Sequence, residues 1–159
     1  MITIGHVDRA PAKIVVSTIL LSKPGIILSV AFTGFAGMVL ANRGGPSLGL
    51  TVLAVLSLLL SAAGSAILNN VLDKQIDTLM SRLSKRVDAL EVVGERTATV
   101  VSLSFIIISL FISFYYLNAV NGALIIAAIL SYTLLYTLYL KRSSPYGTIL
   151  GGLPGALPV

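Results

Sequence analysis

Hydrophobic residues follow one another along this chain in runs that are too long for the helices of a soluble protein. Four windows are long enough to cross a bilayer, which takes about 20 apolar residues at a rise of 1.5 Å each. They cover residues 24–41, 48–68, 97–117 and 122–140. Small residues inside them, as in "TGFAGM" and "SAAGSA", are tolerated in lipid and let helices approach closely. The pattern predicts an all-α, polytopic transmembrane helical bundle with about four spans.

Two terminal segments surround these windows. Residues 14–21 are apolar but too few to span, so we expect residues 1–22 to form a cytoplasmic or interfacial N-terminus. After residue 140, a polar turn leads into "YGTILGGLPGALPV", a Gly/Pro-interrupted apolar segment that we interpret as the start of a fifth span. Residues 1–159 are therefore expected to form one transmembrane domain.

Composition excludes several classes of protein. Hydrophobic residues make up 56% of the chain and charged residues only 11%, which is too few charges to solvate a globule. Cysteine is absent, so a disulfide framework, a thiolate metal site and a cysteine nucleophile are excluded. The net charge of +5 is spread between apolar runs, which predicts no nucleic-acid partner. Membrane lipid headgroups or an anionic substrate are the expected partners of these bases.

Basic residues gather on one side of the predicted bundle. If the spans alternate in direction, Arg43 alone falls on the opposite side from the other lysines and arginines. Those are Arg9, Lys13, Lys23, Lys74, Arg82, Lys85, Arg86, Arg96, Lys141 and Arg142. The positive-inside rule then predicts that the N-terminus and the 69–96 loop are cytoplasmic. We expect the chain to be an integral protein of the cell (plasma) membrane.

Acidic residues are concentrated in that same loop, where a topological signal does not require them. Asn69, Asp73 and Asp77 are spaced i, i+4, i+8, so a continuing helix would stack them on one face. Two carboxylates and an amide oxygen suit Mg²⁺, which usually completes its coordination with waters and substrate phosphates. The same spacing is also common in a solvated, salt-bridged helix end, and spacing alone does not separate the two interpretations.

Basic residues follow the acidic pattern directly. Arg82, Lys85 and Arg86 can meet phosphate oxygens in charge-assisted hydrogen bonds. Carboxylates for a metal and bases for phosphate indicate a diphosphate held by Mg²⁺ at the lipid boundary. A diphosphate whose tail stays in lipid is an isoprenoid diphosphate.

Three segments resemble a known family. "NNVLDKQIDTLMSRLSKR" (69–86) resembles the first aspartate-rich motif of the UbiA-type intramembrane prenyltransferases, N-x-x-x-D-x-x-x-D followed by M-x-R and a second arginine. "YTLYLKRSSPYGTILGGLPGALPV" (136–159) is similar to a block of the protoheme IX farnesyltransferase (heme O synthase) subfamily. "LSKPGIILSVAFTGFAGMVLA" (21–41) is similar, more weakly, to that subfamily's first span with its Lys-Pro entrance. Gln75 departs from the pattern, because an aspartate is common there, but it lies off the face of the two aspartates.

The resemblance implies transfer of a farnesyl group from farnesyl diphosphate to a vinyl group of protoheme IX, giving heme O with the help of Mg²⁺. It implies that Asp73 and Asp77 are the catalytic metal ligands, with Asn69 supporting them. The bases that it suggests for the diphosphate are Arg82, Arg86 and Lys141, although Lys141 could equally be a topological anchor. Alternatives are a quinone precursor or chlorophyllide as acceptor, or a non-catalytic membrane remnant.

The resemblance also predicts how much of the enzyme this chain contains. Members of this family run to nearly twice this length and carry a second aspartate-rich motif in their other half. We therefore expect the chain to be the N-terminal half of such an enzyme and inactive alone. Its expected partner is the missing C-terminal half or a second copy.

Overall fold

The computed structural model describes residues 10–41 and 47–133, and within these ranges every regular element is helical. The elements in order are α1 (Pro11–Ser22), α2 (Pro24–Ala41), α3 (Leu48–Leu72), α4 (Lys74–Asp77), the 3-10 turn η1 (Ser81–Leu83), α5 (Ser84–Val93), α6 (Glu95–Ile112), the π-helical turn η2 (Ser113–Leu117) and α7 (Ala119–Leu130). The all-α class predicted from the sequence is confirmed.

Three of the four predicted spans lie wholly within the described residues. Helices α2, α3 and the continuous pair α6–η2 are long and apolar enough to cross a membrane. The second is longer than predicted, because α3 continues to Leu72. The fourth begins at Ala119, three residues earlier than expected. Residues 134–140 of that window, and the predicted start of a fifth span, lie outside the described residues.

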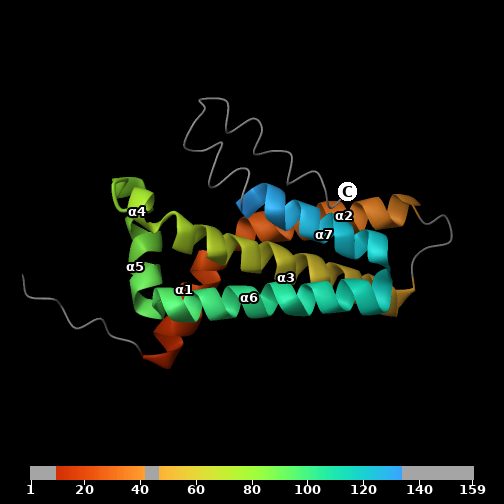
Figure 1. Ribbon diagram of the computed structural model, residues 1–159, viewed down its shortest axis with the longest axis horizontal. Coiled ribbons are helices and arrows are strands. Elements are labelled where there is room, and N and C mark those ends of the chain that lie inside the picture. Colours follow the sequence, from red (N-terminus) through yellow and green to blue (C-terminus); the bar gives the residue numbers. More distant parts are fainter. Residues whose placement is uncertain (1–9, 42–46, 134–159) are drawn as a thin grey trace, which may run out of the picture.

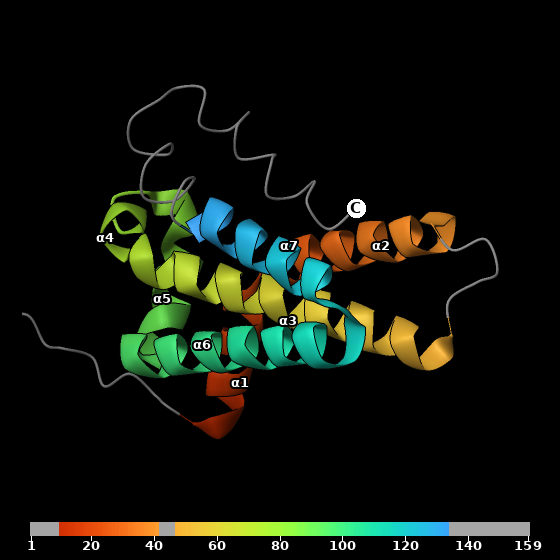
Figure 2. The same ribbon diagram turned by 45° about the vertical axis from the view of Figure 1, so that its right-hand side comes forward.

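Helix α3 is the central element of the bundle. It packs against α6 on one side and against α2 and α7 on the other, and it also contacts α1 and α5. Figures 1 and 2 both show α3 lying between α6 and the α2–α7 pair, all four along the long axis of the molecule. Helices α4 and α5 lie at the end where α3 finishes and α6 begins.

Small and hydroxylated side chains bring α3 and α6 together. The hydroxyl of Ser109 donates to the backbone oxygen of Ser57 at 2.7 Å, and that of Ser102 donates to the oxygen of Gly64 at 2.9 Å. A Cβ atom built on Gly64 would lie 2.8 Å from the backbone oxygen of Ser102, closer than real contacts allow. Glycine therefore permits this crossing. Such contacts are how helices associate in lipid, where the hydrophobic effect gives no drive.

A compact apolar cluster fixes the 69–96 segment against the bundle. Leu21 of α1 and Ile67 of α3 are fully buried there, packed with side chains of α5 and α6. The remaining buried members are Ala89, Leu90, Val93 and Ala98. The cluster thus packs the segment that carries the predicted acidic motif against the rest of the bundle.

Candidate functional site

The predicted acidic motif lies at the junction of α3 and α4. The expectation that the second span continues as one helix is wrong in detail, because α3 ends at Leu72 and Asp73 adopts φ −92° and ψ −1°. The turn is nevertheless bridged by backbone bonds: the Asp73 N–H donates to the Asn69 oxygen and the Asp77 N–H to the Asp73 oxygen, both at 2.9 Å. Helical spacing is thus kept through the junction.

Burial separates the motif from its neighbours. Asp73 and Asp77 are 1% and 5% exposed and Asn69 is 5% exposed, whereas Gln75 between the aspartates is exposed. The three motif side chains are therefore all buried in the protein, while the residue between the aspartates is not. Burying carboxylates is costly unless cations or hydrogen bonds compensate them, and a solvated helix end would not require it.

A hydrogen-bonded chain connects the motif to two other parts of the protein. The Asn69 amide nitrogen donates to the carboxylate of Asp73 at 3.1 Å. The Asn69 amide oxygen accepts from the ammonium of Lys23 at 2.8 Å. That ammonium also lies 3.5 Å from the hydroxyl of Tyr132, just after α7. Lys23 comes from the α1–α2 junction, so the site is assembled from three separate stretches of sequence.

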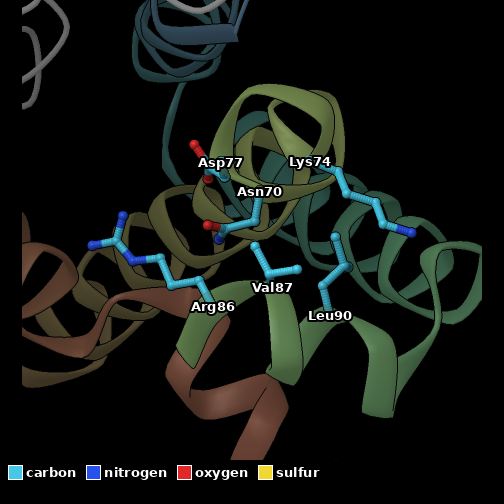
Figure 3. Close-up of a pocket in the computed structure, with 6 residues that line it drawn as sticks. All are labelled: Asn70, Lys74, Asp77, Arg86, Val87 and Leu90. Carbon is cyan, nitrogen blue, oxygen red and sulfur yellow. The ribbon is translucent and has the colours of Figure 1, made fainter. Parts of the chain in front are cut away.

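A narrow hollow lies between the α3–α4 junction and α5, and Figure 3 shows its lining. The residues around it are Asn70, Lys74, Asp77, Arg86, Val87 and Leu90. The carboxylate of Asp77, the amide of Asn70 and the guanidinium of Arg86 lie toward the same side, while the Lys74 side chain extends the opposite way (Figure 3). Asn70 holds its helix to α1, because its amide nitrogen donates at 2.8 Å to the backbone oxygen of Leu21.

Lys74 is engaged elsewhere. Its ammonium lies 2.6 Å from the carboxylate of Glu95 at the start of α6. The hydrogen bond to Glu95 is the largest effect and raises the pKa of Lys74; burial opposes it, and the charges of Glu95 and Glu91 add to the rise. Lys74 therefore connects α4 to α6 through an ion pair.

The predicted phosphate partners differ in position. Arg86 is half-buried on α5 and lines the hollow beside Asp77. Arg82 is exposed on η1 and does not line it. Lys141 lies outside the described residues. Of the two predicted bases that the structure describes, Arg86 therefore lines the same hollow as Asp77 and Arg82 does not.

Sequence reasoning missed the role of Lys23 in this network. It interpreted Lys23 only as a topological charge at a Lys-Pro entrance. Lys23 and Asn69 are 46 positions apart, so no local spacing connects them. The available signal was a lysine placed between two apolar helices directly before a proline.

The donor set fits a hard cation in part. Carboxylate and amide oxygens are the ligands that Mg²⁺ prefers, and it takes few of them from a protein. Within residues 10–41 and 47–133, no group of three or more histidine, cysteine, aspartate or glutamate side chains is placed to hold a metal. The two buried aspartates and the Asn69 amide thus have the chemistry that such a cation prefers but are fewer than a complete set of ligands.

The fold and site together define a polytopic helical membrane protein with paired carboxylates at the mouth of its bundle. The chain belongs to the UbiA prenyltransferase family, whose sequence pattern it matches over residues 30–159. It is 47% identical over 122 residues to the protoheme IX farnesyltransferase of Geotalea uraniireducens, an alignment that covers 77% of this chain and 47% of the relative. It is 38% identical over 150 residues to the protein of that name from Aquifex aeolicus, covering 94% of this chain and 51% of the relative.

These comparisons confirm the family predicted from the acidic motif. The chain spans about half the length of the curated relatives it matches. No solved structure matches it.

Proposed function

We propose that this chain supplies the first half of the active site of a Mg²⁺-dependent prenyltransferase. The enzyme transfers a farnesyl group from farnesyl diphosphate to a vinyl group of protoheme IX, giving heme O for the pathway to heme A. The observation that carries the proposal is the burial of Asp73 and Asp77, with Lys23 hydrogen-bonded to Asn69 and Arg86 lining the same hollow as Asp77. The names of the curated relatives support the choice of acceptor and donor.

The residues of this chain would bind the metal, orient its ligands and neutralise the charge of the diphosphate. Asp73 and Asp77 would hold the Mg²⁺, and Asn69 orients Asp73 by donating from its amide nitrogen to the carboxylate. Arg86 approaches from α5 and offsets the charge of the diphosphate, and Arg82 and Lys141 are kept as further predicted partners. When bound, the metal supplies Lewis-acid stabilisation of the departing diphosphate. Fixed charges in a dry site are effective here because charge develops on the leaving group as the bond breaks.

We also propose that the site opens to the cytoplasmic face of the cell membrane. The mouth carries Lys23, Lys74 and the bases of η1 and α5, which accords with the positive-inside rule. Helix α1 is too short to span, and its exposed Val15, Val16 and Ile19 suit a place in the interface. The remaining carboxylates and the rest of the substrate pocket come from a C-terminal half or from a second copy.

The test replaces each motif aspartate in the chain co-expressed with a C-terminal half of a family member. Asp73→Asn and Asp77→Asn each remove one buried charge at nearly constant shape, and we expect each to lower heme O formation by about 100-fold or more. Asp88→Asn is the matched control, because Asp88 is exposed on α5 outside the motif. Heme O is measured from protoheme IX and farnesyl diphosphate at a range of Mg²⁺ concentrations. Retention of Mg²⁺-dependent activity in either motif variant would refute the assignment.

A further inference from the structure

Lys23 reaches the candidate site from outside the acidic motif. It adopts φ 58° and ψ 65°, ends α1 through a 3.2 Å bond from its N–H to the Leu20 oxygen, and is followed by Pro24, which begins α2. A left-handed conformation is unfavourable for a residue with a Cβ, so packing must hold Lys23 there. The consequence is that the ammonium is delivered to Asn69.

The Asn69 side chain is shared between a cation and a carboxylate. Its oxygen accepts from Lys23 at 2.8 Å, and its nitrogen donates to Asp73 at 3.1 Å. If Asn69 is a metal ligand, its oxygen must face the Mg²⁺. An ammonium and a divalent cation on one amide oxygen would repel strongly at that distance. Lys23 and the metal therefore compete for the same oxygen atom.

The other bases of this end are placed differently. Lys74 is paired with Glu95, and Arg82 and Lys85 are exposed. Arg86 stands on the α5 side of the motif, whereas Lys23 comes from the α1–α2 side. The ammonium of Lys23 is thus connected to the buried carboxylate of Asp73 through a single intervening side chain, that of Asn69.

We propose that Lys23 exchanges partners when the substrate binds. This inference rests on the proposed function. In the absence of ligand the ammonium of Lys23 occupies the Asn69 oxygen. When a diphosphate arrives, the ammonium moves to a phosphate oxygen, and the Asn69 oxygen is released to the metal. Metal and diphosphate then each bind more tightly in the presence of the other, with Lys23 as the source of the coupling.

This exchange predicts that one variant binds the metal more tightly and the diphosphate more weakly. Lys23→Met removes the competing cation, so the metal alone should bind several-fold more tightly than in the unmodified chain. The same variant loses a contact to the anion, so diphosphate should bind about tenfold more weakly. The coupling between the two ligands, typically about 5- to 150-fold where it exists, should fall close to one. A merely structural role for Lys23 would weaken both ligands together.

The experiment uses the 159-residue chain in phosphatidylcholine nanodiscs, alone and co-expressed with a C-terminal half of a family member. Mn²⁺ stands in for Mg²⁺, and its free concentration is read from its paramagnetic resonance signal. Radiolabelled inorganic diphosphate is bound with and without saturating Mg²⁺. The variants are Lys23→Met and Lys23→Arg, with Lys13→Met as the matched control at an exposed lysine of α1, outside the acidic motif and the bases that follow it.

The expected result is tighter Mn²⁺ and weaker diphosphate binding in Lys23→Met, near-normal diphosphate binding in Lys23→Arg, and no change in Lys13→Met. Shifts of both ligands in the same direction, or no shift, would overturn the exchange while leaving the metal site intact. Binding that is no stronger in the unmodified preparations than in Asp73→Asn would instead reject the proposed function, and the exchange with it.

Discussion

The close crossing of α3 and α6 at Gly64 gives the sharpest prediction about the scaffold of the site. Gly64→Ala would place a Cβ atom 2.8 Å from the backbone oxygen of Ser102 and 2.9 Å from Cγ1 of Ile106. The Ile106 side chain can move, but the backbone oxygen cannot without parting the helices. Restoring an ordinary contact of 3.4 Å to that oxygen requires a displacement of about 0.6 Å.

The magnitude follows from three contributions. Overpacking of a tight contact costs about 1–3 kcal/mol. The displacement also stretches the hydrogen bond from Ser102 to the Gly64 oxygen, now 2.9 Å, and such a bond contributes about 0.6 kcal/mol in a membrane protein. Alanine regains up to about 1 kcal/mol over glycine as a helix former. We expect a net loss of about 1–2 kcal/mol in the free energy of unfolding.

The assay is unfolding of the chain in mixed micelles with increasing sodium dodecyl sulfate, followed by far-ultraviolet circular dichroism. Gly49→Ala is the matched control, because Gly49 belongs to the same helix and a Cβ there meets nothing within 4 Å. It shares the gain in helix propensity without the clash, so it should be neutral or slightly stabilising. Equal stability of the two variants would refute the close-crossing explanation of α3–α6 packing.

Three further predictions address topology, the Lys74–Glu95 ion pair and completeness. Reporter fusions at Arg43 and Arg86 should report opposite sides of the membrane, and the same side for both would contradict the cytoplasmic site. Glu95→Gln should destabilise the chain by about 0.2–1 kcal/mol, as for other exposed ion pairs. The pKa of Lys74 is raised above its ordinary 10.5, so the contribution of the ion pair to stability is fully present below pH 10.5 and is lost as the pH rises through the raised value. The difference in stability between the unmodified chain and Glu95→Gln should therefore vanish in strong alkali. A difference that persists there would argue against the pair. The 159 residues alone should form no heme O, since two carboxylates leave much of the diphosphate charge uncompensated; product from the chain alone would overturn its role as a half site.

Local sequence patterns were sufficient to find the acidic motif but not to predict which side chains lie around it. Asn69, Asp73 and Asp77, chosen by their i, i+4, i+8 spacing, are all buried, and backbone bonds keep that helical spacing even through the turn at Asp73. Charge patterning could not rank the bases. Arg82 and Arg86 look alike in the sequence, yet Arg82 is exposed on η1 while Arg86 lines the hollow from α5, a helix that packs against α3.

The sequence by itself determined that the chain is a helical membrane protein, since long apolar windows have no other stable form in lipid. It also determined the acidic motif and the family, because both are carried by residues close together in the chain. Only the tertiary structure decided that Lys23, 46 residues from Asn69, holds the amide that orients Asp73, and that Lys74 is turned away to Glu95. Contacts between distant segments depend on how helices cross, and here that crossing is set by glycine and serine contacts that leave little trace in a hydrophobic pattern.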